Sequence, residues 1–159
     1  GLGVYETGFG EVAVINLIGR CGMDFGPESP FFEVDRLIKD SSAKIILVDF
    51  HAEATSEKLA LANYLDGRVS AVWGTHTHVQ TSDGRVLPRG TGYITDLGMT
   101  GPINSVIGIK TEISISMFLG NPPRRFEAAG GDGKIECAIF EIDEKTGRCL
   151  GVKTLRITD

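Results

Sequence analysis

The sequence is poor in cysteine, and its three cysteines form no recognisable motif. Cys21, Cys137 and Cys149 are odd in number and lack the C-x-x-C spacing of zinc sites and redox centres. Cys137 and Cys149 fall in strand-like segments, where a thiol acts as a small apolar core group. This usage argues against a disulfide-stabilised secreted scaffold, so we expect a reduced, cytoplasmic chain.

Long apolar runs and an excess of positive charge are also missing. No segment approaches the roughly 20 apolar residues that a membrane-spanning helix needs, and no signal peptide is visible. The net charge of -5 gives no general attraction to nucleic acids or anionic membranes. A small phosphate ester bound through a metal ion is compatible with this charge, because the ion supplies the local positive charge.

The length and composition are those of one globular domain. Of the 159 residues, 42% are apolar and 23% are charged, which is enough apolar material for a core. Residues 1–5 have the pattern of a linker that leads into a strand. Apolar, β-branched runs predict strands over residues 11–17, 44–50, 68–73 and 92–97. Apolar residues at helical spacing predict helices over 30–39, 55–65 and 110–119, and a glycine-rich segment predicts a loop over 19–29.

The order of these elements predicts an α/β fold with a mixed sheet. Strand, helix and strand within about thirty residues form a right-handed βαβ unit with a parallel strand pair. Two further β-rich runs, 134–142 and 149–157, are joined by a turn-like segment at 143–147. They predict an antiparallel C-terminal hairpin that closes the sheet. We therefore expect a single domain over residues 1–159.

The three histidines follow the ends of two predicted strands. His51 directly follows the run 44–50, and His76 and His78 come just after the run 68–73. Because ligands bind beyond the carboxyl ends of parallel strands, we expect these imidazoles at one edge of the sheet. Imidazole binds zinc, iron and manganese, so the pattern favours a metal site. Two loop histidines without a ligand, or a single-zinc hydrolase, are the alternatives.

Four carboxylates lie near the histidines in the sequence: Asp49, Glu53, Asp83 and Asp96. A hydrolytic two-metal centre normally includes carboxylate ligands, one of which often bridges the ions. We expect these four to orient ligands or cap loops rather than to ligate the metal themselves. The predicted site is therefore incomplete.

Several long stretches resemble one known family. Together with the motif Gly74-Thr75-His76-Thr77-His78, they are similar to the YmdB-like bacterial phosphodiesterases, a branch of the calcineurin-like metallophosphoesterases. These stretches cover residues 48–58, 65–72, 74–81 and 93–102.

The resemblance implies a four-layer α/β/β/α sandwich, of which this chain would form a part. It also implies two metal ions, usually iron or manganese, with zinc or magnesium as alternatives. The implied reaction is hydrolysis of phosphodiesters such as cyclic nucleotides by a hydroxide that the two ions activate. His51 and His76 resemble ligands of one ion, and His78 resembles a ligand of the other.

Family members carry a further segment before the part that this chain resembles. It holds a glycine-aspartate motif, a glutamate-asparagine pair and a glycine-asparagine-histidine motif whose histidine assists the leaving group. None of these motifs precedes the histidines here. We therefore expect the C-terminal portion of the domain, with the histidine half of the site and weak metal binding by itself.

A half-domain of this kind would leave one side of its sheet uncovered. We expect it to associate with the missing N-terminal segment or with a second copy of itself. The alternative function is a catalytically inactive fragment that serves as a binding or assembly module.

Overall fold

A computed structural model describes residues 1–23 and 28–159, so residues 24–27 of the predicted loop lie outside the described part. The fold is mixed α/β, as predicted, with two sheets. A six-stranded sheet has the order β1-β2-β3-β4-β6-β5, and a three-stranded sheet has the order β7-β8-β9. The strands are β1 (Leu2–Thr7), β2 (Gly10–Ile18), β3 (Ile45–His51), β4 (Ala71–Thr75), β5 (Arg85–Val86), β6 (Gly92–Ile94), β7 (Thr100–Pro102), β8 (Gly133–Ile142) and β9 (Cys149–Thr158).

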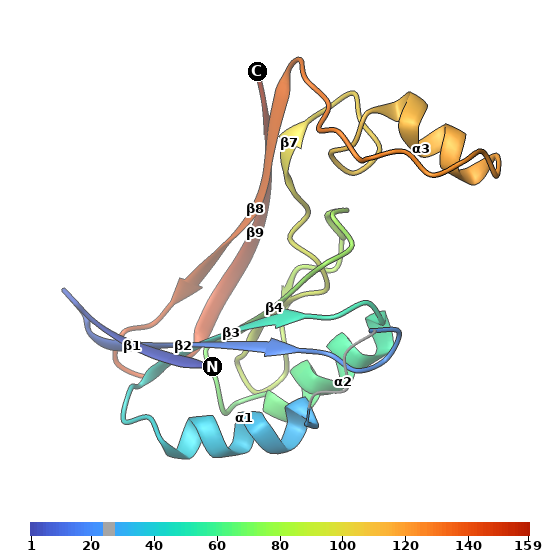
Figure 1. Ribbon diagram of the computed structural model, residues 1–159. Helices are drawn as coiled ribbons and strands as arrows, with labels where there is room; N and C mark the ends of the chain where they lie inside the picture. The colour runs from blue at the N-terminus through green and yellow to red at the C-terminus, as the bar shows by residue number, and fades with distance from the viewer. Residues whose placement is uncertain (24–27) are drawn as a thin grey trace.

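The four central strands of the large sheet, β2, β3, β4 and β6, run parallel to one another. Helices α1 (Pro30–Lys39) and α2 (Thr55–Leu65) make the two crossovers, from β2 to β3 and from β3 to β4. The predicted βαβ unit is confirmed in β3, α2 and β4. Both helices lie on the same face of the sheet (Figure 1). On the opposite face, the Trp73 ring of β4 lies near the Phe140 ring of β8.

The two faces of β3 differ in burial, and this difference positions the site. Val48 and Phe50 are fully buried in the core that α1 and α2 cover, and each contributes about 1.5–3 kcal/mol of burial free energy. Asp49 and His51 alternate with them and are only half-buried. Side chains alternate along a strand, so polar groups collect on the face that the helices do not cover.

The N-terminal residues were predicted to form a linker, and that prediction was wrong. Residues 2–7 form β1, which pairs antiparallel with β2 in a hairpin. The turn uses Gly10 at a φ of 96°, and the Thr7 hydroxyl donates to the Gly10 carbonyl at 2.6 Å. The glycines at 1 and 3 masked the alternating pattern from which a strand would have been recognised.

Two strand boundaries also differ from the prediction. Strand β4 starts at Ala71 rather than Arg68, because the Arg68 amide donates to the Leu65 carbonyl in the turn after α2. Strand β6 ends at Ile94 rather than residue 97, because the amides of Thr95 and Asp96 bond to side chains instead of a strand. The short strands β5 and β7 lie in segments for which no strand was predicted.

The C-terminal hairpin forms as predicted but does not close the large sheet. Strands β8 and β9 pair with each other, and β8 pairs with β7, in a separate sheet. Gln80 connects the two parts, since its Nε2 lies within 3.2 Å of the carbonyls of Leu97, Cys137 and Leu155. The three cysteines are free, and Cys149 is buried.

A third helix, α3 (Thr111–Phe118), lies at the far end of β8 and β9, away from α1 and α2 (Figure 1). We call residues 110–127 the α3 arm. Its base is joined by an ion pair of 2.6 Å between Lys110 and Glu127. Its large apolar side chains are mostly exposed: Ile115, Met117, Phe118, Leu119 and Phe126. Within the described residues, no helix is both long enough and apolar enough to cross a membrane.

Protonation of Asp83 at low pH should destabilise the loop before β5. This carboxylate accepts hydrogen bonds from Thr95 N (3.1 Å), Thr95 Oγ1 (2.6 Å) and Thr81 Oγ1 (2.7 Å). Burial raises the pKa of Asp83, but these bonds outweigh burial and hold the pKa below its usual value. The stabilisation is therefore present above the unfolded pKa and is lost as pH falls through the lower folded pKa.

We predict that Asp83→Asn lowers the unfolding free energy at pH 7 by about 1–3 kcal/mol, because an amide nitrogen replaces a needed acceptor. The difference from the wild type should shrink as pH falls below about 3.9, the ordinary pKa of an aspartate, because the unfolded wild type then binds a proton that the folded carboxylate resists. Urea unfolding at pH 7 and pH 3 measures both effects, with the exposed Asp132→Asn as the control. An equal difference at both pH values would contradict the assignment.

Candidate metal centre

The ends of β3 and β4 bring two of the histidines together. His51 is the last residue of β3, and Thr75 is the last residue of β4. The two are direct neighbours in the parallel register, and His76 follows Thr75 at once. The carboxyl ends of adjacent parallel strands therefore deliver both imidazoles to one edge, as predicted.

The facing ring nitrogens of His51 and His76 lie very close. His51 Nε2 is 3.0 Å from His76 Nδ1, and the ring planes meet at 90°. Two bare lone pairs at this distance repel, so a proton or another cation must lie between them. The outer nitrogen of His76, Nε2, is 3.1 Å from the Glu53 carboxylate. The pair thus fits two imidazole ligands of a shared metal ion.

His78 is not brought to the same point. It is exposed, and its Nδ1 lies 3.2 Å from the carbonyl oxygen of Ile107. Across residues 1–23 and 28–159, no three His, Cys, Asp or Glu side chains gather in a way that could hold a metal ion. The described chain therefore brings His51 and His76 together and holds His78 on the same loop as His76.

Both loop histidines have unusual backbone conformations. His76 has a φ of 103° and His78 a φ of 61°, and the Ile107 that contacts His78 has a φ of 46°. Non-glycine residues rarely adopt positive φ, and each such residue costs on the order of 1–3 kcal/mol. Strain of this kind persists only where the surrounding structure holds it, and it is concentrated at functional sites.

A buried carboxylate holds this strained loop. Asp96 Oδ2 accepts hydrogen bonds from Thr77 N at 3.0 Å and from Thr77 Oγ1 at 2.8 Å, and Thr77 lies between the two histidines. The same oxygen is 3.0 Å from Lys58 Nζ in an ion pair whose side chains are 1% and 0% exposed. Lys58 comes from α2, so this pair ties the loop to the helix layer.

Gly74 allows the end of β4 to approach the residues after β6. A Cβ atom at this position would lie 1.8 Å from the carbonyl oxygen of Thr95. The Leu97 amide also donates to the Gly74 carbonyl at 3.0 Å. Glycine at position 74 therefore lets Asp96 lie directly beneath the histidine loop.

The four carboxylates singled out from the sequence all bond to protein groups. Asp83 and Asp96 hold loops, Asp49 accepts hydrogen bonds from two neighbouring strands, and Glu53 contacts His76. Sequence reasoning gave no role to Lys58, because a lysine in an amphipathic helix is ordinarily solvated. No local signal marked it, since its partner lies 38 residues away.

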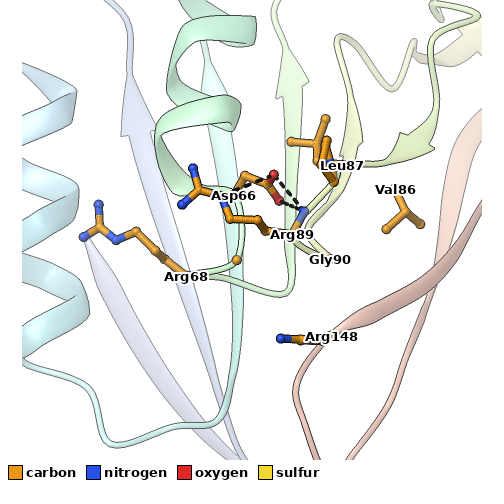
Figure 2. Close-up of a pocket in the computed structure, with 9 residues that line it drawn as sticks. Asp66, Arg68, Val86, Leu87, Arg89, Gly90 and Arg148 are labelled. Carbon is orange, nitrogen blue, oxygen red and sulfur yellow. Dashed lines mark hydrogen bonds and ion pairs between the residues drawn. The ribbon is translucent and has the colours of Figure 1, made fainter.

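A large hollow in the described chain lies elsewhere, at the amino ends of the strands. It measures about 490 Å³ and is lined partly by Arg68, Arg89 and Arg148 (Figure 2). The Arg68 guanidinium points away from the hollow toward Asp35 of α1, at 2.5 Å, and Arg89 lies 3.9 Å from Asp66. Because two of these cations are paired, the hollow lacks the converging free charges of an anion site.

Comparison with known proteins places this arrangement in a family. The family model described as "YmdB-like protein" matches residues 1–155. The chain belongs to the YmdB-like family. It is 48% identical over 153 residues to a Bacillus subtilis protein named 2',3'-cyclic-nucleotide 2'-phosphodiesterase, covering 94% of this chain and 57% of that protein.

Two crystal structures have the same fold as this YmdB-like chain. One is a hypothetical protein from Thermus thermophilus, with a TM-score of 0.92, 42% identity, and 100% and 62% coverage of the two chains. The other is a phosphatase from Mycoplasma pneumoniae, with a TM-score of 0.92, 37% identity, and 99% and 57% coverage. The chain therefore spans little more than half the length of the relatives that it matches.

We predict that Lys58→Met severely destabilises this YmdB-like chain. The change keeps the length of the side chain but leaves the Asp96 carboxylate buried without its cation, which costs about 3–5 kcal/mol. Urea unfolding should show a much lower midpoint, and the amide signals of residues 76–78 should move. Arg36→Met, which breaks an exposed ion pair on α1, should leave the midpoint near that of the wild type. Equal midpoints for the two variants would contradict the assigned role of Lys58.

Proposed function

We propose that this chain supplies the histidine ligands of a two-metal phosphodiesterase site. The observation that carries the proposal is the 3.0 Å separation of His51 Nε2 and His76 Nδ1 at the carboxyl edge of the sheet. The strained loop that holds His76 and His78 supports it, because such strain is typical of functional sites. The remaining ligands would come from residues outside this chain.

In this proposal, the three histidines are divided between the two metal ions. His51 and His76 would hold one ion, and His78, two residues further along the loop, would contribute to the second. Iron or manganese suits imidazole ligands combined with oxygen ligands, and zinc or magnesium is the alternative. When bound, the ions would supply Lewis acidity and positive charge at the phosphoryl oxygens. A leaving-group acid is expected from outside the chain as well.

The substrate that we propose is a cyclic nucleotide or a similar small phosphodiester. The name of the Bacillus subtilis relative supports this class, and the shared family membership supports proposing it for this chain. The chain has a net charge of -5, so the attraction of a phosphodiester would depend on the ions rather than on the protein.

A second candidate function is a binding or assembly module without catalysis. Two observations favour it: no three metal-ligating side chains gather within the described residues, and the α3 arm exposes several large apolar side chains. Both functions are compatible with association with a segment that carries further metal ligands, or with a second copy of the chain. Metal content separates the two candidates.

We predict close to two metal ions per chain when the protein is purified together with the segment that completes the site. Elemental mass spectrometry measures the metal, and intact mass on the same sample identifies any co-purifying polypeptide. In the 159-residue chain alone, the two facing imidazoles should bind Mn²⁺ weakly. No metal in the completed protein would favour the assembly module.

We predict that His51→Ala abolishes cyclic-nucleotide hydrolysis in the longest natural polypeptide that contains this chain. Loss of a direct ligand should reduce kcat/KM by more than the roughly 10–100-fold that follows loss of an outer-shell group. The circular dichroism spectrum should stay the same, because His51 lies at the end of its strand. The control is Asp132→Asn, an exposed carboxylate whose side chain makes no hydrogen bond to a histidine in the described structure. Unimpaired turnover of 2',3'-cyclic AMP by His51→Ala would show that this histidine is not a ligand.

A further inference from the structure

A chain of hydrogen bonds runs across three strands and ends at His51. Asn16 of β2 donates its Nδ2 hydrogen to Asp49 Oδ2 at 2.9 Å. Thr75 of β4 donates its Oγ1 hydrogen to Asp49 Oδ1 at 3.3 Å, and His51 Nδ1 lies 3.0 Å from the same Thr75 oxygen. We call Asn16, Asp49, Thr75 and His51 the sheet relay.

The sheet itself assembles this relay. Asn16 is the register partner of Asp49 between β2 and β3, and His51 is the register partner of Thr75 between β3 and β4. All four side chains lie on the face opposite α1 and α2, where polar groups are not forced into the apolar core. The relay therefore depends on strand register, which a slip of one residue would destroy.

The direction of each bond follows from the chemistry of the groups. A carboxylate only accepts hydrogen bonds, so the single hydroxyl hydrogen of Thr75 goes to Asp49. The Thr75 oxygen must then accept from His51, which requires the hydrogen of the His51 ring to be on Nδ1. In the neutral ring, Nε2 is consequently left with its lone pair free.

That lone pair can accept a hydrogen from the other ring or bind a metal ion. His51 Nε2 faces His76 Nδ1 at 3.0 Å, and Glu53 contacts the other nitrogen of His76. Metal-ligating histidines commonly donate their second ring nitrogen to a carboxylate, which fixes the tautomer and raises ligand basicity. Here the carboxylate acts on His51 through a threonine hydroxyl.

We propose that Asp49 and Thr75 are positioning residues that fix the Nδ1–H tautomer of His51 and direct its Nε2 toward the metal site. This inference rests on the proposed function only for the identity of the ligand. The tautomer itself is a property of the metal-free chain and can be measured without any metal or substrate.

The test compares Thr75→Val with Thr75→Ser in the metal-free 159-residue chain. Valine matches threonine in shape but has no hydroxyl, whereas serine keeps the hydroxyl. Long-range ¹⁵N–¹H NMR correlations of the histidine rings distinguish the two tautomers. We expect Nδ1–H at His51 in the wild type and in Thr75→Ser, and a shift toward Nε2–H in Thr75→Val.

Asp49→Ala provides a second route to the same result, should the valine variant fold poorly. Without the carboxylate, the Thr75 hydroxyl is free to donate to His51 Nδ1, so the Nε2–H tautomer should again increase. An Nε2–H tautomer in the wild type, or an unchanged tautomer in both Thr75→Val and Asp49→Ala, would overturn the relay.

Metal affinity gives the functional half of the test. Calorimetric titration with Mn²⁺, on the same variants in the site-complete protein, should show about 10–100-fold weaker binding for Thr75→Val and recovery for Thr75→Ser. Unchanged affinity despite a changed tautomer would overturn the positioning role. If the wild-type protein binds no metal while the tautomer is as expected, the proposed function fails and the tautomer assignment stands.

Discussion

The buried ion pair between Lys58 and Asp96 is the constraint on which the histidine loop depends. A carboxylate and an ammonium group removed from water are stable only when other groups satisfy their remaining hydrogen-bonding capacity. Asp96 meets this condition by accepting from Thr77 and Gly98 as well as from Lys58. The same bonds hold Thr77 in place, and they thereby maintain the positive φ angles of the residues on either side. The Lys58–Asp96 pair therefore contributes both to the stability of the fold and to the geometry of the histidine loop.

The two faces of the large sheet carry different kinds of side chains, apolar on one and mainly polar near the histidines on the other. Its helix-covered face buries apolar side chains such as Val48 and Phe50, and this burial holds the sheet together. The opposite face carries the sheet relay and the imidazole pair toward the carboxyl ends of the strands. The arginine-lined hollow at the amino ends is large but has paired charges.

Under the proposed function, the YmdB-like chain would present an ordered but incomplete site. It spans little more than half of its relatives, and within the described residues the pair of facing nitrogens needs further ligands to become a two-metal centre. The α3 arm exposes large apolar side chains, which are typical of association surfaces. Under that proposal, the imidazoles would be oriented before the remaining ligands are added.

The sequence by itself determined the α/β class, the βαβ unit and the edge at which His51 and His76 meet, because these follow from local periodicity and from the geometry of parallel strands. It also identified Asp49, Glu53, Asp83 and Asp96 as groups near the site. It missed β1, whose glycines hide the strand pattern, and it placed the C-terminal hairpin in the wrong sheet.

Only the tertiary structure decided which groups touch. The pairing of Lys58 with Asp96, the bond between His51 and Thr75, and the contact of His78 with Ile107 join residues 24 or more positions apart. Contacts of this kind depend on strand register and on close backbone approach at Gly74, which local sequence does not encode.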